Sequence, residues 1–463
     1  MTQNPKRSPL DSFLGIFADV EEGEGVNALL MFANIFLILT AYYILKTVRE
    51  GLIIGSGGLL GLDGDELKIY ASATMAILLL GVVPLYGGLA SRVNRITLLN
   101  YCMLGVMGSL IIFFALGQAG VSVALAFFLW LGIVNVFLIA QFWSYANDIY
   151  SEAQGKRLFA VIAIGASLGA ILGPRIAKIG KEHTFWLMLV AALVFAICQL
   201  LYNIVNRREA SMAAQLSDEK LAPVEEPLSK DGGFSLVFRQ KYLLLIALML
   251  LLGNVVNTTG EFILSNAAKT HATELVPDSP HAEIADESER ASEIKSDRTK
   301  IITGFYGDFF SLVNLLGLLI QAFLVSRIFK HLGVRTALFF LPVIALGAYG
   351  AIGAVGGLLL IRIAKSAENS TDYSLHNTVR QALFLPTSRE AKYKAKAAID
   401  TFFVRMGDAL AAGLVAVGLH VLAFDARSFA FMNVGIIVVW IAVAVGIAKR
   451  HKELTAEEKV VTP

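Results

Sequence analysis

Long apolar runs separated by short polar turns are the feature that most limits how this 463-residue chain can fold. Hydrophobic side chains make up 56% of the sequence and charged side chains only 16%. About 20 apolar residues in a helix cross the hydrocarbon core of a bilayer. The sequence therefore predicts twelve transmembrane helices, at 28–49, 69–90, 97–117, 121–147, 157–178, 184–205, 241–267, 302–327, 335–354, 356–385, 395–422 and 427–448.

A polar segment divides these runs into two sets of six, and the basic turns GGLASRVNRITLL (87–99) and VSRIFKHLGVRTAL (325–338) echo each other. Two related six-helix bundles are the layout of transporters that expose a central site to each side of the membrane in turn. We predict an all-α membrane protein, major-facilitator-like, with five parts. These are an N-terminal segment with an amphipathic surface helix (1–27), a first bundle (28–205), a linker (206–240), a second bundle (241–448) and a tail (449–463).

Lysine and arginine gather in alternate turns, and the positive-inside rule then fixes the orientation. The basic turns share a side with both termini and with the linker, so we expect a multi-pass protein of the cell inner membrane with both termini in the cytoplasm. The longest segment on the opposite side, 271–300, is rich in acidic residues and is predicted to be a mobile, solvated spacer.

Several classes of protein lack support. The two cysteines, Cys102 and Cys198, lie inside apolar runs, so neither a disulfide framework nor a zinc site is available. No phosphate-binding glycine loop, HExxH pair or GxSxG elbow occurs in the sequence. We therefore expect no enzyme, no catalytic residue, no metal and no cofactor. The formal net charge of +2 is too small to indicate nucleic acid as a partner.

The tenth predicted span and the segment after it, Ile361 to Ala412, are unusually polar for a membrane protein. Ionisable residues recur there every three or four positions, which places them on one face of a helix: Lys365, Glu368, Asp372, His376 and Arg380. Ionisable groups in hydrocarbon are costly, so this stripe must face protein or water. We predict that Lys365, Glu368, Asp372 and His376 act in coupling or gating. Arg380 lacks an acidic neighbour within the stripe, and we assign it to substrate binding.

The first span ends in a cation cluster of Lys46 and Arg49 beside Glu50. Arginine forks around phosphate or carboxylate and lysine acts as a point charge, so this cluster suits an anionic ligand. The alternative is that these side chains anchor the helix end at the membrane surface. We assign Lys46 and Arg49 to substrate binding and Glu50 to coupling or gating.

The seventh span carries a polar stripe of Asn254, Asn257, Thr258 and Glu261. Glu261 is the best candidate in this span for a proton carrier or counter-ion, because a partly desolvated carboxylate binds a proton more readily. A structural pair between Glu261 and Lys269, or between Glu261 and a cation of the first half, is the alternative.

The fourth span ends in AQFWSYANDIY, which puts Gln141, Ser144, Tyr145 and Asp148 on one face with Trp143 and Asn147 beside it. Aromatic rings and amides can stack a planar base and read its edge, although an aromatic belt at the membrane surface explains the rings as well. Tyr145 and Asn147 are predicted to bind substrate, and Asp148 to act in coupling. The following span has Gly165, Gly169 and Gly173, a stripe for close helix packing.

Three stretches carry a resemblance to a known family: FWSYANDIYSEAQGKRLFAVIAIGASLGA (142–170), GDFFSLVNLLGLLIQ (307–321) and DYSLHNTVRQALFLPTSREAKYKAKAAID (372–400). Together they resemble the nucleotide transporter family. That family includes the ATP/ADP exchangers (NTP/NDP antiporters) of plastids and obligate intracellular bacteria and is related to the major facilitator superfamily. The resemblance implies exchange or proton-linked movement of a nucleotide or a similar phosphorylated anion.

The resemblance also adds candidate residues. Charged residues that the family uses in its first, seventh and eleventh spans match Arg49, the region Asn257–Glu261, and Lys394 or Lys396. Asn257 and Lys396 therefore join the predicted substrate site. The sequence departs from the family in three places: Asn257 replaces an acid, Arg49 replaces a lysine, and Ser91 replaces the usual aspartate of the basic turn. These departures concern the substrate more than the fold.

The sequence thus favours a monomeric secondary transporter in membrane lipid that moves an anionic small molecule, in the first place a nucleotide, by alternating access. A proton-driven exporter of another compound is one alternative. In that case transport would persist when Arg49 and Arg380 are neutralised and collapse when Glu261 is. A membrane scaffold or sensor that does not transport is the other.

Overall fold

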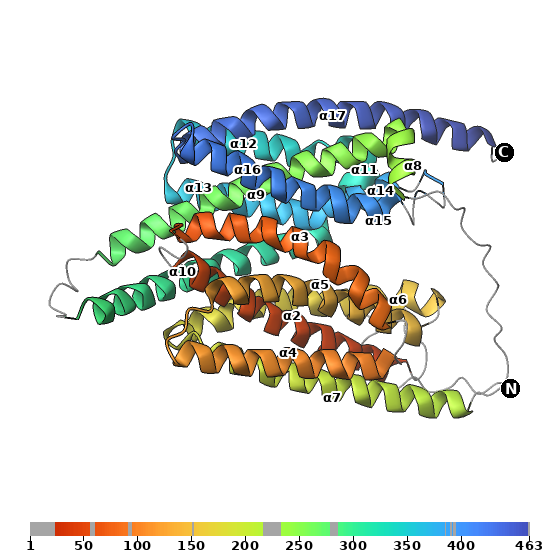
Figure 1. Ribbon diagram of the computed structural model, residues 1–463. Coiled ribbons are helices and arrows are strands. Elements are labelled where there is room, and N and C mark those ends of the chain that lie inside the picture. The colour runs from red at the N-terminus through yellow and green to blue at the C-terminus, as the bar shows by residue number, and fades with distance from the viewer. Residues whose placement is uncertain are drawn as a thin grey trace. The chain divides into compact units, whose positions relative to one another are not determined.

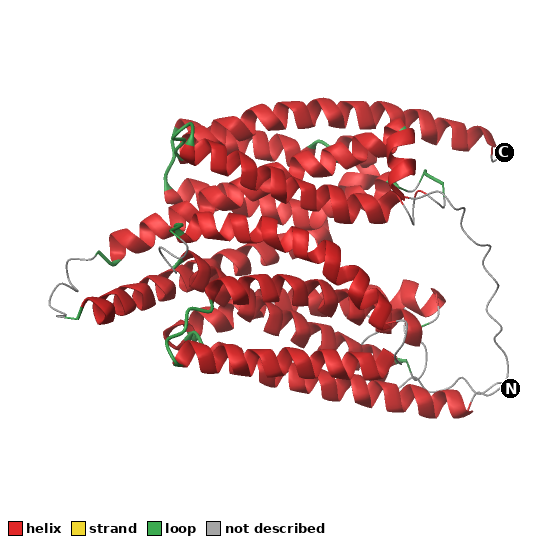
Figure 2. Cartoon of the chain, in the orientation of Figure 1, coloured by secondary structure: helices red, strands yellow, loops and turns green. Residues whose placement is uncertain are grey.

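The computed structural model describes residues 24–55, 61–90, 95–150, 152–215, 233–277, 286–384, 386–388, 391 and 395–461. Figures 1 and 2 show that these segments are built almost entirely of helices joined by short turns. The predicted N-terminal segment with its surface helix, except for residues 24–27, and residues 216–232 of the predicted linker lie outside the described residues. The chain divides into two compact units, and two helices are shared between them.

Unit 1 comprises Met1–Ser56, Leu79–Ala222 and Thr299–Ser311. It contains most of the first half of the sequence and one segment of the second half, the middle of a long helix. Its helices are α2 (Gly25–Ile54), the later part of α3 (Gly64–Ala90), α4 (Arg95–Gln118), α5 (Ala124–Ile149), α6 (Glu152–Ile179), the short 3₁₀ segment η1 (Lys181–His183), α7 (Trp186–Gln215) and the middle of α10 (Glu287–Leu319).

Unit 2 comprises Gly57–Leu78, Pro223–Arg298 and Leu312–Pro463. It contains the start of α3, both ends of α10 and the rest of the second half. Its other elements are α8 (Gly233–Arg239), α9 (Lys241–Leu275), η3 (Ile320–Leu324), α11 (Val325–Ala337), α12 (Phe340–Ala354), α13 (Leu358–Thr371), η4 (Asp372–His376), α14 (Asn377–Leu383), α15 (Lys396–Ala398), η6 (Ile399–Phe403), α16 (Val404–His420) and α17 (Ala426–Val461).

Each predicted span has a helical counterpart, and the all-α prediction holds for the described chain. Within that part, eight helices are long and apolar enough to cross a membrane, and a ninth candidate is the bent pair Arg327–Ala337 and Phe340–Ala354. The remaining predicted spans include the polar segment around α13, whose charges lower its hydropathy. The number twelve therefore stays a prediction.

The predicted mobile spacer at 271–300 is wrong for most of its length. Helix α9 continues to Leu275, and α10 already begins at Glu287. Asp286 caps α10, because its Oδ1 accepts the backbone N–H of Glu289 at 3.2 Å. Acidic residues near the start of a helix also stabilise it, because the N-terminal end of the helix dipole is positive. The acids that suggested a solvated spacer therefore stabilise a helix.

The glycine stripe of α6 has the predicted structural role. A Cβ on Gly165, Gly169 or Gly173 would lie 2.6, 2.2 or 2.5 Å from the backbone carbonyl oxygens of Phe32, Phe36 and Thr40 in α2. Only glycine allows two helix backbones to approach this closely. The α2–α6 contact therefore fixes α2, which carries the first-span cations, within unit 1.

We expect Gly169→Ala to lower the free energy of unfolding by about 1–3 kcal/mol, the usual cost of overpacking, because backbone atoms cannot rotate away. Gly105→Ala in α4 is the matched control, since its Cβ would meet nothing within 4 Å. That control is expected to be neutral or stabilising by about 0.5–1 kcal/mol. Thermal unfolding of both purified variants measures the difference, and equal melting temperatures would contradict the close packing.

The exposed start of α17 offers a test of pH dependence. Asp425 Oδ1 accepts the Ser428 N–H at 2.8 Å and the Ser428 hydroxyl at 2.7 Å, and these bonds lower the pKa of the Asp425 carboxyl. A carboxyl whose pKa is lower in the folded state stabilises the fold at any pH above its pKa in the unfolded chain. This stabilisation is lost as the pH falls through its pKa in the folded state. Asp425→Ala should cost about 1 kcal/mol at pH 7. The difference in melting temperature from the parent should vanish in strong acid.

Candidate functional site

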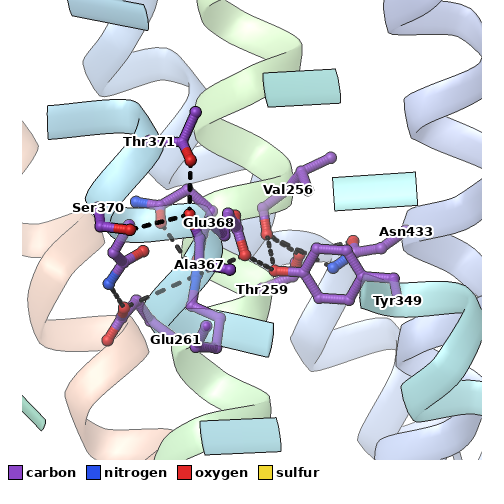
Figure 3. A network of polar contacts seen from close by, with 12 residues as sticks. Val256, Thr259, Glu261, Tyr349, Ala367, Glu368, Ser370, Thr371 and Asn433 are labelled. Carbon is purple, nitrogen blue, oxygen red and sulfur yellow. Dashed lines mark hydrogen bonds and ion pairs between the residues drawn. The ribbon is translucent and has the colours of Figure 1, made fainter. Parts of the chain in front are cut away.

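The polar segment of α13 lies against α9 and α12 in unit 2, and Figure 3 shows its side chains converging with theirs. We call seven residues the buried network: Lys68, Asn257, Glu261, Tyr349, Lys365, Glu368 and Asn369. They come from α3, α9, α12 and α13. The rest of unit 2 thus supplies the protein interior that the sequence required around this stripe.

Lys365 is the centre of the buried network and is only 1% exposed. Its ammonium donates to Glu368 Oε2 at 3.0 Å and to Asn257 Oδ1 at 3.1 Å, and it lies 3.7 Å from Glu261 Oε1. A buried cation is tolerated only when acceptors replace its lost water. Asn257 therefore contacts a lysine of its own unit.

Glu368 is held more tightly than any other acid of the buried network. The hydroxyl of Tyr349, a fully buried residue, donates to its Oε2 at 2.8 Å, next to the bond from Lys365. These two donors replace hydrogen bonds to water that the carboxylate loses on burial. Close by, the Thr259 hydroxyl donates to Asn433 Oδ1 at 2.7 Å, which extends the polar contacts to α17 (Figure 3).

Glu261 forms the looser end of the buried network. Asn369 Nδ2 donates to its Oε1 at 3.0 Å, but its two lysine contacts are longer, 3.5 Å to Lys68 and 3.7 Å to Lys365. The Glu261 side chain is 23% exposed, against 5% for Glu368. The charges of the two lysines and two glutamates cancel formally. Glu261 is the most exposed of the four side chains, so gaining or losing a proton there costs less free energy than at the other three.

The later part of the stripe does not continue on the same helical register. Residues Asp372–His376 form a π-helical segment, which inserts extra length and rotates the residues that follow. His376 faces α17, where its ring lies 6.0 Å from that of Trp440. The ion pairs of Lys365 within the described residues are with Glu368 and Glu261, and not with Asp372. Within the stripe, the ion pair that the structure shows is the one between Lys365 and Glu368.

Arg380 has an acidic partner that the stripe itself did not contain. Its Nε lies 3.8 Å from Asp400 Oδ1, and its Nη2 donates to Asn377 at 3.3 Å. Lys396 donates to Gln381 and lies 5.9 Å from the Phe384 ring. The stretches 377–383 and 396–400 therefore form a second polar cluster in unit 2.

The polar stripe of α9 divides between two partners. Asn257 and Glu261 join the buried network, whereas Asn254 and Thr258 donate to Asp408 Oδ1 in α16 at 2.7 and 2.8 Å. Arg405 adds a third contact to the Asp408 carboxylate at 3.1 Å. Glu261 lies 3.5 Å from Lys68, a cation of the first half of the sequence, while Lys269 pairs with Asp63 and Asp65.

The cations of α2 lie in unit 1 and are backed by aromatic rings. Lys46 Nζ lies 4.3 Å from the Phe310 ring centre and 5.1 Å from that of Tyr43. Arg49 lies over Phe128 at 4.3 Å and also donates to the buried Glu50. Aromatic faces attract a cation and hold it in place while it keeps its charge.

The predicted face of α5 packs mainly within unit 1. The Tyr145 ring is buried at 5.2 Å from that of Tyr202 in α7, and Gln141 Nε2 donates to Cys102 at 3.0 Å. Trp143 packs edge-on against Phe159 of α6. Asn147 and Asp148 lie in the last turn of α5, and their side chains are outside the described set.

Sequence reasoning missed Lys68, Tyr349, Asn369 and Phe310. Lys68 follows Asp65 and Glu66 at the start of a predicted span, and this charge cluster was a usable signal. Tyr349 and Phe310 sit in apolar runs and look like ordinary core aromatics. Asn369 lies one position off the stripe, so helical spacing alone could not select it.

Comparison with known proteins places the chain beside nucleotide carriers. A family model described as the TLC ATP/ADP transporter matches residues 303–451. The ADP,ATP carrier protein 1 of Chlamydia trachomatis is 22% identical over 312 residues, which cover 59% of this chain and 54% of that protein. The ADP,ATP carrier protein 3 of Rickettsia felis is 22% identical, and the match covers 70% of this chain and 69% of that protein. The predicted resemblance to this family is confirmed.

The chain spans just over half to about three fifths of the length of the first two relatives, 54% and 62%. Solved structures share its fold. A peptide transporter POT with bound sulfate has a TM-score of 0.61 at 16% identity and covers 92% of this chain and 95% of its own. The nucleoside transporter NupG has a TM-score of 0.57 at 13% identity, with 92% and 99% covered. The chain therefore shares its fold with these solved transporters, and the matching family model and relatives are named as transporters and carriers.

Proposed function

We propose that this protein is a secondary transporter that carries a nucleotide of the ATP or ADP type across the inner membrane by alternating access. The observation that carries this proposal is the buried network in unit 2, which holds two lysines and two glutamates against the candidate membrane span α9. Buried ionisable groups inside a membrane protein are costly and mark ion or substrate pathways. The matching family model and relatives carry ATP and ADP in their names, and we take the proposed substrate class from these names.

In this proposal the α2 cations bind the phosphates. Lys46 is held by Tyr43 and Phe310, and Arg49 by Phe128 and Glu50, so both bring fixed positive charge to an anion. Arg380 and Lys396 are proposed as a second cationic contact. Glu261 is proposed to carry a proton or to balance the substrate charge, because its ion pairs are longer than that of Glu368.

A ligand-dependent thermal shift tests the substrate class. ATP or ADP at one hundred times its dissociation constant should stabilise the folded protein by about 2.7 kcal/mol. Sugar phosphates and carboxylates at the same concentration form the comparison panel. Arg49→Gln should abolish most of the nucleotide shift. Arg450→Gln should keep it, since Arg450 is an exposed residue that pairs with Glu453 near the end of α17.

Stabilisation by sugar phosphates or carboxylates, with no response to either nucleotide, would overturn the nucleotide assignment. A nucleotide shift that survives in Arg49→Gln would instead move the phosphate site away from α2. The proposed cytoplasmic location of both termini follows from the distribution of Lys and Arg in the sequence, and protease protection of tagged termini in spheroplasts tests this orientation.

A further inference from the structure

The middle of α10 belongs to unit 1, although the helix lies in the second half of the sequence and both of its ends belong to unit 2. Close packing fixes this segment. A Cβ on Gly51 of α2 would lie 2.0 Å from the Thr303 hydroxyl, and one on Gly307 would lie 2.9 Å from the Pro174 carbonyl of α6. This segment therefore docks directly on the helix that carries Lys46 and Arg49.

A salt bridge strengthens the docking. Lys178 Nζ of α6 lies 2.7 Å from both carboxylate oxygens of Asp308. Both side chains are partly exposed, so this pair alone is worth only a fraction of a kcal/mol to about 1 kcal/mol. The pair affects the placement of Phe310, because Asp308 lies only two residues before Phe310 in α10.

Docking brings the Phe310 ring under the Lys46 ammonium. The ring centre lies 4.3 Å from Nζ, closer than that of Tyr43 at 5.1 Å, and the two rings meet edge to face at 6.3 Å. Phe310 is almost fully buried. A lysine side chain loses up to about 2 kcal/mol of rotamer entropy when a ligand immobilises it, and a ring that restricts it beforehand reduces this loss.

We propose that Phe310 is a positioning residue for the anionic substrate: it holds the Lys46 ammonium in place, and the Lys178–Asp308 pair holds Phe310 by docking α10 on α2 and α6. This inference rests on the proposed function, since the anion is taken to be the transported nucleotide. It assigns substrate affinity to a residue of the second sequence half that never touches the anion itself.

The test measures nucleotide affinity, from thermal-shift titrations, in a series at position 310. Phe310→Leu should weaken ATP binding about fivefold, the scale of about 1 kcal/mol for a cation–π contact. Phe310→Tyr and Phe310→Trp, which keep an aromatic face, should bind ATP about as tightly as the parent. Phe195→Leu, another fully buried phenylalanine of unit 1, is the control for loss of packing and should leave affinity unchanged.

A double-mutant cycle with Lys46→Gln asks whether Phe310 acts through Lys46. In the Lys46→Gln background, Phe310→Leu and Asp308→Asn should have no further effect on affinity. Additive losses, or tighter binding in Phe310→Leu, would overturn the proposal. If Lys46→Gln leaves no measurable binding, the ATP affinities of the position-310 series decide. Proteins with Trp, Phe or Tyr at position 310 should bind more tightly than Phe310→Leu, and affinities unrelated to aromatic character would contradict the proposal.

Inorganic pyrophosphate is the second probe and separates this proposal from the function it rests on. If the protein binds pyrophosphate with the same dependence on Phe310 but binds neither ATP nor ADP, the positioning role of Phe310 stands and the nucleotide assignment is wrong. Nucleotide binding that is insensitive to Phe310 would do the reverse. A parent protein that binds neither probe would overturn both.

Discussion

Lys365→Met is expected to lower the free energy of unfolding by about 3–5 kcal/mol, the cost of leaving a buried charge without its partner. The change removes the ammonium that Glu368 and Asn257 contact at 3.0 and 3.1 Å. Two glutamates of the buried network would then face a single lysine, Lys68, at 3.5 Å from Glu261. Thermal unfolding of the purified variant in detergent measures the loss.

The double variant Lys365→Met/Glu368→Gln separates charge from packing. It restores formal neutrality, and Tyr349 can still donate to the oxygen of the new amide, so most of the stability should return. Lys449→Met, at an exposed position, controls for loss of a lysine in general. A double variant that melts as low as Lys365→Met would contradict the account, because packing alone would then explain the loss.

Glu261→Gln should abolish coupled transport, with at least about a tenfold loss of rate, the effect of about 1.4 kcal/mol. The glutamine keeps the shape and can still accept from Asn369, but it can neither exchange a proton nor balance Lys68 and Lys365. The rate of labelled nucleotide uptake into proteoliposomes, with and without a proton gradient, is the measurement.

Two variants bound this result. Lys68→Met/Glu261→Gln restores charge balance and should recover thermal stability without recovering transport, because the exchangeable carboxylate is still missing. Glu453→Gln, which neutralises an exposed glutamate, should transport like the parent. Full recovery of transport in the double variant would show that Glu261 only compensates Lys68 and carries nothing.

The sequence predicted the helices better than the way in which they group. Apolar runs located the long helices because a bilayer demands about 20 apolar residues per span. Nothing in that signal divides a helix between two units, as happens in α3 and α10. The docking of α10 depends on contacts such as Gly51 with Thr303, which join residues far apart in sequence. Periodicity describes one helix at a time and cannot contain such pairs.

The candidate site shows the same limit. Helical spacing selected Lys365, Glu368 and Glu261 because charged residues stand out in an apolar segment, and all three lie in the buried network. It failed beyond Asp372, where a π-helical segment changes the register. It also assigned no partners, since Tyr349 and Lys68 belong to other helices and their residue types are common in such positions.

Counterflow in proteoliposomes tests the central claim most directly. Vesicles that contain the purified protein and are loaded with unlabelled ADP should take up external labelled ATP or ADP transiently above its equilibrium level. Uptake should saturate with concentration and disappear in Arg49→Gln. Uptake no greater than in protein-free vesicles, while a known carrier reconstituted in parallel works, would contradict the account of this protein as a nucleotide transporter.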